Sequence, residues 1–165
     1  MSKIRHIVPH FAVTGALRPD DIRAAAALGF KAIISNLPDG EGGAPLSSAE
    51  EGRLAVESGL AFRHIPTNKF EVFSDRVVDS MIAALGEFEG PVLGHCASGA
   101  RTALAWAGAA ARHQTPDCVL ATLAKAGFDH SAVRDELEDQ HQKPLAGPLV
   151  PALDCDCDAE DQRTV

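Results

Sequence analysis

The chain contains no tyrosine and a single tryptophan among its 165 residues, so it has no aromatic platform on which nucleic acid bases could stack. Its formal net charge is −8, and the sequence shows no basic patch. No apolar stretch is long enough to span a membrane, and residues 1–11 lack the apolar core of a signal peptide. These absences argue against nucleic acid and membrane partners, and they predict a cytoplasmic protein.

The composition is otherwise that of one globular domain. The chain is 45% hydrophobic, which provides enough apolar residues for a sizeable core. Proline, glycine and aspartate dominate from residue 144 onward. This pattern predicts one domain over residues 1–143 and a mobile acidic tail over residues 144–165. Nothing in the sequence indicates a resident cofactor or metal.

The four cysteines do not have the spacing of a disulfide framework, which predicts free thiols in a reducing compartment. Cys118 lies in an apolar helical stretch and is predicted to be chemically inert. Cys155 and Cys157 lie among four acidic residues between 154 and 160, and such paired thiols can bind a soft metal or accept sulfur. Two thiolates do not complete a zinc site, and nearby carboxylates raise a thiol pKa, so a solubilising tail is favoured.

Apolar runs alternate with helical periodicities along the chain, which predicts an α/β fold with a mostly parallel central sheet flanked by helices. Ser47 with Glu50, or Ser48 with Glu51, forms a capping box before the second helix. Ligand sites in such sheets lie at the carboxyl ends of the strands, so three loops are expected to meet there. The expected strands are 11–14, 32–36, 61–65 and 92–95; the helices are 19–28, 47–58, 75–88, 102–112, 117–126 and 131–139; and the loops are 38–43, 66–74 and 96–101.

The octapeptide His-Cys-Ala-Ser-Gly-Ala-Arg-Thr at 95–102 is the most informative motif. An apolar strand precedes it and a helix-forming run follows it, so Cys96 is expected on a tight loop at a helix N-terminus. Free amides, the helix dipole and Arg101 favour a thiolate nucleophile there, although a cysteine can also be simply a small buried residue. Small loop residues let the backbone close around an anion. The predicted anion-binding residues are Ala97, Ser98, Gly99, Ala100, Arg101, Thr102 and His95.

Several neighbouring side chains allow both a functional and a structural interpretation. His95 either tunes the thiolate or is a buried histidine satisfied by the backbone. The hydroxyls of Thr102 and Ser98 either donate to the Cys96 sulfur or have no role. His64 is expected to pack in its strand, and Trp106 is expected in the core.

Two features bear on the chemistry of this loop. Only four residues separate Cys96 from Arg101, whereas tyrosine and dual-specificity phosphatases place five, and a smaller ring fits one terminal sulfur better than a tetrahedral phosphoryl group. The stretch 64–70, where such phosphatases carry an acidic residue that protonates the leaving oxygen, has no aspartate. Asp39 is the alternative acid if its loop folds over the site. Transfer of a sulfane sulfur, as in rhodanese-type enzymes, needs no such acid.

Three motifs, at 34–41, 64–66 and 95–102, together with Trp106 resemble the beta-lactamase-hydrolase-like, phosphatase-like domain family. The resemblance covers roughly residues 5–128 and implies a fold similar to dual-specificity phosphatases. Members occur alone or joined to persulfide dioxygenases and sulfide-oxidising flavoproteins, which implies handling of sulfane sulfur. Cys96 matches the nucleophile, Arg101 the anion-binding arginine, and residues 39–41 an acidic loop over the site. Leu37, where relatives usually carry arginine, is a departure, and Ala97 is often larger or basic.

The sequence therefore predicts a sulfurtransferase with Cys96, Arg101 and Asp39 in its catalytic site. Cys96 would take the outer sulfur of a low-molecular-weight persulfide or thiosulfate and hold it as a persulfide. The acceptor would be a thiol such as glutathione, and the partner a persulfide dioxygenase or a sulfide-oxidising flavoprotein. One alternative is a cysteine-dependent phosphatase that forms a Cys96 phosphocysteine with Asp39 as acid. The other is a non-catalytic redox or anion-binding module.

Overall fold

The computed structural model describes residues 1–143 and 147–157. Within these residues, no helix is both long enough and apolar enough to cross a membrane. The strands are β1 (Arg5–Val8), β2 (Phe11–Thr14), β3 (Ala32–Ser35), β4 (Ala61–His64) and β5 (Val92–His95). The α-helices are α1 (Pro19–Ala27), α2 (Ser48–Glu57), α3 (Asp75–Glu87), α4 (Ala100–Ala110), α5 (Pro116–Lys125) and α6 (Arg134–His141). Short 3₁₀ turns cover η1 (Ser131–Val133) and η2 (Pro151–Leu153).

The sheet has the strand order β1-β2-β5-β3-β4. β2, β5, β3 and β4 run parallel, and only β1 is antiparallel to its neighbour. The predicted α/β fold with a mostly parallel sheet is therefore confirmed. β1 was not predicted from the sequence, because a four-residue edge strand before a proline carries little periodicity.

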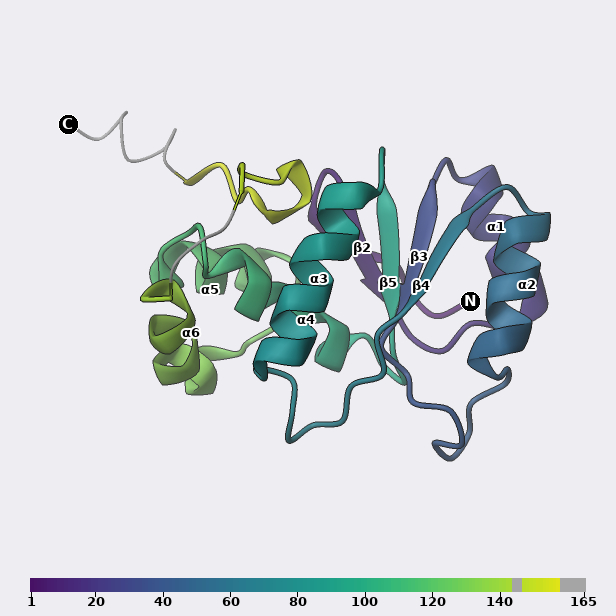
Figure 1. Ribbon diagram of the computed structural model, residues 1–165, viewed down its shortest axis with the longest axis horizontal. Helices are drawn as coiled ribbons and strands as arrows, with labels where there is room; N and C mark the ends of the chain where they lie inside the picture. The colour runs from purple at the N-terminus through teal and green to yellow at the C-terminus, as the bar shows by residue number, and fades with distance from the viewer. Residues whose placement is uncertain (144–146, 158–165) are drawn as a thin grey trace.

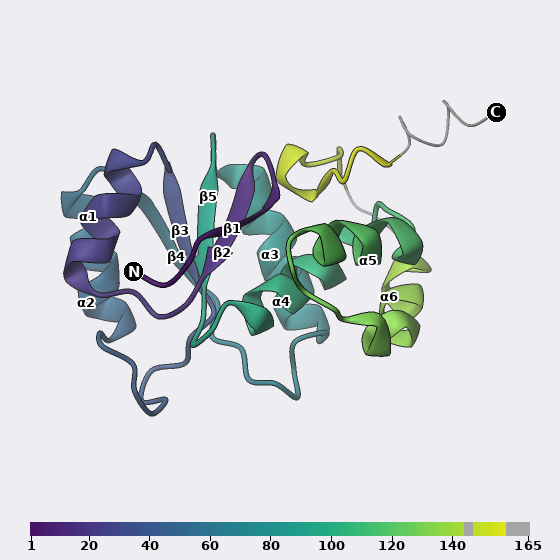
Figure 2. The ribbon, with the colours of Figure 1, turned by 180° about the vertical axis from the view of Figure 1, so that it is seen from behind.

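Helices cover both faces of the sheet. Figures 1 and 2 show α1 and α2 on one face and the helices from α3 to α6 on the other. The α1/α2 face buries a small cluster that includes Ile22, Leu54 and Leu93, while the opposite face buries the larger core around Trp106. The central strands β3 and β5 are buried along their whole length, as expected for strands covered on both sides.

A local capping rule placed the start of α2 correctly. Ser47 caps α2, accepts a hydrogen bond from the Glu50 N–H and forms the full capping box with that residue. Of the two predicted capping boxes, the structure therefore contains the one formed by Ser47 and Glu50. The side chain of Glu51 takes no part in the cap. α4 begins two residues earlier than predicted, because Gly99 adopts a left-handed φ of 94° and serves as its N-cap.

The last described segment, residues 147–157, packs on the domain. Val150, Ala152 and Leu153 are buried, and the Trp106 indole N–H donates to the Ala152 carbonyl at 2.7 Å. The prediction of a mobile tail from residue 144 is therefore wrong for residues 150–153, because their apolar side chains complete the core around Trp106. The rest of the predicted boundary between domain and tail stays a prediction.

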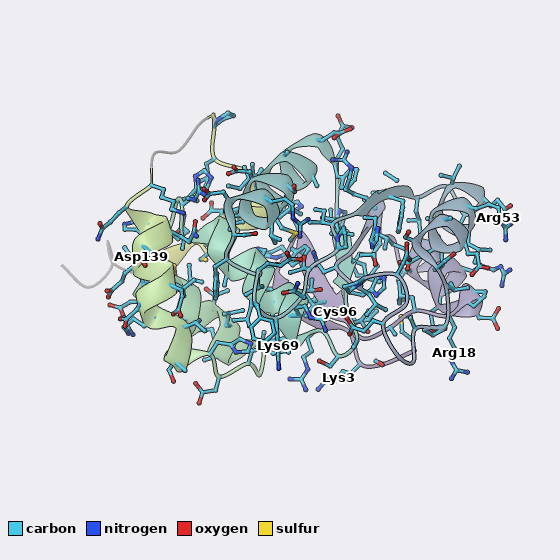
Figure 3. All side chains as sticks on the ribbon, turned by 60° about the horizontal axis from the view of Figure 1, so that its bottom comes forward. Lys3, Arg18, Arg53, Lys69, Cys96 and Asp139 are labelled. Carbon is cyan, nitrogen blue, oxygen red and sulfur yellow. A yellow bond between two sulfur atoms is a disulfide. The ribbon has the colours of Figure 1, made fainter. Side chains whose placement is uncertain are left out.

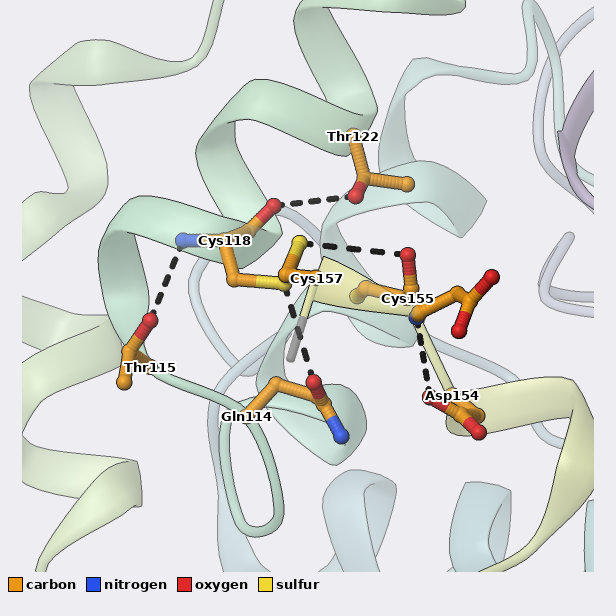
Figure 4. Close-up of a disulfide and its surroundings, with 8 residues drawn as sticks. Gln114, Thr115, Cys118, Thr122, Asp154, Cys155 and Cys157 are labelled. Carbon is orange, nitrogen blue, oxygen red and sulfur yellow. Dashed lines mark hydrogen bonds between the residues drawn. A yellow bond between two sulfur atoms is a disulfide. The ribbon is translucent and has the colours of Figure 1, made fainter. Parts of the chain in front are cut away.

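The prediction of free thiols is wrong for Cys118 and Cys157, which form a disulfide (Figure 4). Folding brings the chain end back onto α5, and a spacing rule cannot anticipate that. Cys155 is a free thiol beside Thr122, and burial raises its pKa to about 11. One thiol of the predicted pair is therefore occupied, and part of the acidic stretch 154–160 lies outside the described residues.

Replacing Cys118 and Cys157 together by serine is expected to lower the free energy of unfolding by about 2–4 kcal/mol, because the cross-link restricts the unfolded chain. Denaturant unfolding followed by the fluorescence of Trp106, the single tryptophan, measures the change. Cys155→Ser removes the free thiol and is the matched control, with a smaller expected effect. Equal unfolding free energies for the double variant and the parent protein would contradict the cross-link.

Candidate active site

Cys96 lies directly after β5 and four residues before α4, as the sequence predicted. It is buried, and the Gly99 N–H donates to its sulfur at 3.1 Å. Gly99 is also the N-cap of α4, so the sulfur lies at the positive end of the helix dipole. These surroundings suit an anion bound against the sulfur.

Gly94 explains how α4 comes so close to the sheet. A Cβ atom at this position would lie 2.6 Å from Cγ2 of Thr102 and 2.8 Å from the Phe11 ring. Only glycine lets the first turn of α4 pack directly on β5. The start of the helix is thereby held against the strand that carries Cys96.

Arg101 joins three loops. Its guanidinium forms a two-pronged ion pair with Glu41, at 3.0 and 2.8 Å, and donates to the Thr67 carbonyl at 2.8 Å. The loops after β3, β4 and β5 therefore meet at one edge of the sheet, at the lower side of Figure 1. This confirms the predicted convergence.

The Glu41 carboxylate occupies the same donors that a bound oxyanion would use. The hydrogen bonds from Arg101 lower the pKa of this carboxyl, so Glu41 is ionised at neutral pH. An anionic ligand must therefore displace Glu41 or share Arg101 with it. The matched acidic loop does reach the site, but through Glu41.

Asp39 is not placed as a proton donor. Its carboxylate accepts hydrogen bonds from the backbone N–H and the hydroxyl of Ser48, both at 2.6 Å, at the start of α2. These bonds lower the pKa of Asp39, whereas a general acid must hold its proton near the working pH. The contacts suit stabilisation of the helix start, and they do not support the predicted catalytic role of Asp39.

Residues 97–100, between Cys96 and Arg101, have mixed exposure. Ala97 and Ser98 are exposed, and the Ala97 carbonyl accepts a hydrogen bond from the Ala16 N–H at 3.3 Å. Thr102 is fully buried, and its hydroxyl has no hydrogen-bond partner in the described part of the chain. Of the two interpretations of Thr102, the hydroxyl bond to the Cys96 sulfur is therefore not formed among the described residues.

His64 and His95 have different surroundings. The His64 ring is hydrogen-bonded to the Leu37 carbonyl at 2.9 Å, which joins the end of β4 to the turn after β3. This agrees with a packing role. His95 is almost fully buried and pairs with Glu51 of α2.

A pocket of about 260 Å³ opens beside the cysteine. Figure 3 shows Cys96 and Lys69 close together on the face of the molecule that carries the loops. The lining contains two cationic side chains and no carboxylate, in a chain whose net charge is −8. The pocket therefore suits an anionic ligand. Its lining residues are Lys69, Val72, Cys96, Ser98, Ala100, Arg101 and Leu104.

Sequence patterns did not identify Glu51, Thr67 or Lys69 as part of this region. Glu51 had one usable signal: it shares the buried face of α2 with Leu54 and Ala55, where a carboxylate is unexpected unless it has a partner. Thr67 contributes a backbone carbonyl, which no sequence pattern can identify. Lys69 is brought to the pocket by the path of the loop after β4.

The mostly parallel sheet, the buried cysteine at a helix N-terminus and the arginine in the first turn of that helix define an α/β domain with a candidate catalytic cysteine. Residues 3–113 match the family described as beta-lactamase hydrolase-like protein, phosphatase-like domain, and the chain belongs to that family.

Proteins similar to this chain are found among curated sequences and solved structures. The beta-lactamase hydrolase-like protein of Xylella fastidiosa (strain Temecula1) is 30% identical over 105 residues, which are 64% of this chain and 24% of that protein. The chain thus spans about a quarter of the length of this relative. The structure of a candidate phosphatase from Neisseria meningitidis Z2491 has a TM-score of 0.71 and 27% identity, covering 83% of this chain and 97% of its own.

A second similar structure shows the fold alone. The catalytic core of the PP-IP phosphatase Siw14 from Saccharomyces cerevisiae has a TM-score of 0.58 and 15% identity, covering 82% of this chain and 83% of its own. The resemblance in fold to this class of phosphatases, inferred from three short motifs, is thereby confirmed.

The prediction of a sulfurtransferase is wrong. The family is phosphatase-like, and the solved structures of similar fold are phosphatases or candidate phosphatases. A thiolate at a helix N-terminus beside an arginine suits a phosphoryl group as well as a sulfane sulfur, so the loop length and the missing aspartate could not decide between them. The predicted sulfur donors, thiol acceptors and partner enzymes, and the cytoplasmic location, stay untested.

Proposed function

We propose that this protein is a cysteine-dependent phosphatase that hydrolyses phosphate monoesters through a Cys96 phosphocysteine. The observation that carries the proposal is the position of the Cys96 sulfur: it accepts the Gly99 N–H at the start of α4, the helix whose first turn bears Arg101. The phosphatase-like family supports the same chemistry.

The reaction has two displacement steps at phosphorus. In the first, the Cys96 thiolate forms the S–P bond while the P–O bond to the leaving group breaks. In the second, water attacks the phosphocysteine, the S–P bond breaks, and phosphate leaves with the thiolate restored. Arg101, the loop amides and the α4 dipole stabilise the negative charge on the phosphoryl oxygens in both steps.

The pocket supports esters with good leaving groups. Its lining residues contain no carboxyl group that could protonate the departing oxygen, and Asp39 is held by Ser48. Glu41 reaches the site, but its hydrogen bonds with Arg101 lower its pKa, so it does not hold a proton to donate. A phenol leaves without such help more readily than an aliphatic alcohol, because its oxyanion is more stable. The favoured substrates are therefore aryl phosphates and other monoesters whose leaving group is acidic.

A series of aryl phosphates with phenols of graded acidity tests this proposal. The expected result is sustained phosphate release whose kcat/KM falls steeply as the phenol becomes less acidic. Brief quenching of the reaction should trap one phosphoryl group on Cys96, detected by intact-protein mass spectrometry. Absence of Cys96-dependent phosphate release from every ester would overturn the proposed function.

Asp39→Asn tests whether Asp39 protonates the leaving oxygen. Because its carboxylate contacts Ser48, the variant is expected to change kcat/KM by less than about 3-fold along the whole series, a change below 1 kcal/mol. A large loss confined to the poorest leaving groups would instead assign the acid to Asp39.

A further inference from the structure

The side chains of β5 alternate between the two faces of the sheet just before the nucleophile. Leu93 belongs to the cluster on the α1/α2 face, whereas a Cβ at Gly94 would meet α4 on the other face. His95 therefore shares the face of Leu93 and points toward α1 and α2. The last side chain before Cys96 is thus in reach of a helix that lies outside the catalytic loop.

Glu51 of α2 meets this histidine. The exposed fractions of the two side chains are 1% for His95 and 4% for Glu51, and the carboxylate is hydrogen-bonded to His95 Nε2. A carboxylate only accepts, so Nε2 carries the hydrogen and the ring orientation is set by this bond. The other ring nitrogen, Nδ1, is buried without a hydrogen-bond partner in the described residues, so no second bond in that region orients the ring.

The backbone at His95 is held as well. Its carbonyl accepts a hydrogen bond from the Asn36 N–H at 2.8 Å, which continues the pairing of β5 with β3 up to the loop. The next residue is Cys96, whose sulfur must meet the Gly99 N–H. Because this region is closely packed, we expect a rotation of the His95 ring to shift the chain that leads into the loop.

We propose that Glu51 is a positioning residue for the nucleophile: through His95 it holds the end of β5 so that the Cys96 sulfur stays against the Gly99 N–H. The inference rests on the proposed function for its kinetic readout, while the reactivity of the Cys96 thiol tests it separately. Glu51 acts without touching the substrate.

Three substitutions of Glu51 separate the effect of its hydrogen bond to His95 from the effect of its negative charge. Glu51→Leu removes the acceptor, and Glu51→Asp keeps the charge but withdraws it from the ring by one methylene. Both are expected to lower kcat by about 10-fold to 100-fold with KM changed less than about 3-fold, because a misplaced reacting atom is costly while Arg101 still binds the anion. Glu51→Gln keeps an acceptor for Nε2–H and is expected to retain most of the activity.

The alkylation rate of Cys96 by iodoacetamide, read at the peptide level by mass spectrometry, is expected to follow the same order. The matched control is Glu50→Leu, since the Glu50 carboxylate accepts the Ser47 N–H at the α2 cap, and its loss is expected to affect stability and not Cys96. A rate of Cys96 alkylation that falls in Glu51→Leu and Glu51→Asp but not in Glu51→Gln supports the inference, even if the protein hydrolyses no ester.

Two results would overturn the inference. One is unchanged alkylation in all three Glu51 variants. The other is an equal loss in Glu51→Gln and Glu51→Leu, which would assign the effect to charge. If Glu51→Leu does not fold, as shown by circular dichroism, the comparison of Glu51→Asp with Glu51→Gln decides the question alone.

Discussion

Replacement of Cys96 by serine is expected to abolish phosphate release from aryl phosphates, with a loss of kcat on the order of 10⁴-fold or more. A serine hydroxyl stays protonated at neutral pH, and no base among the residues lining the pocket can take its proton. The phosphocysteine cannot form in this variant. The measurement is steady-state phosphate release together with the mass of the quenched protein.

Cys155→Ser is the matched control, because Cys155 is the other free cysteine of the described residues. Burial raises its pKa to about 11, so its thiol contributes little thiolate at neutral pH, and its removal is expected to leave kcat unchanged. The Cys96→Ser protein should still bind inorganic phosphate, since Arg101 and the helix N-terminus remain. Activity within 10-fold of the parent protein in Cys96→Ser would refute the phosphocysteine mechanism.

The second large effect is expected at Arg101. Arg101→Lys should lower kcat/KM by about 10²-fold to 10³-fold, because an ammonium group cannot reproduce the planar two-pronged contact with an oxyanion. The substitution also disturbs the contacts with Glu41 and the Thr67 carbonyl that hold three loops together. Initial rates over a range of aryl phosphate concentrations separate the effect on kcat from that on KM.

Two comparisons make this prediction specific. Arg53→Lys changes an exposed arginine that pairs with Glu57 on α2, and it should leave the kinetics unaltered. Glu41→Gln removes the carboxylate that competes for Arg101, so KM for the anionic ester should fall. Unchanged kcat/KM in Arg101→Lys would remove Arg101 from the anion site.

The error about sulfur transfer has a physical origin in the motif. Cys96, the small loop residues and Arg101 define a cysteine beside an anion site, and this description does not depend on which electrophile the cysteine attacks. The loop length bears only on the size of the anion site, and the absence of aspartate in 64–70 bears only on protonation of the leaving group. Neither identifies the atom that Cys96 attacks. The family resemblance was itself interpreted through the sulfur-handling enzymes to which its members are joined. The phosphatase-like family together with the similar solved structure of a candidate phosphatase favours the other chemistry.

The sequence by itself determined the features that depend on neighbouring residues: the helix cap at Ser47, the buried parallel strands, and Cys96 with Arg101 at a strand–helix junction. Periodicity, turn chemistry and capping act over a few residues, so they can be followed along the chain.

Tertiary structure alone decided which distant groups meet. Glu41 reaches Arg101 across 60 residues, Glu51 reaches His95 across 44, and the 150–157 segment returns to Trp106 and Cys118. Asp39, in contrast, is held by Ser48 at the start of α2. These pairings follow from the convergence of loops at one edge of the sheet and from the packing of helices on its faces, and no local rule contains that geometry.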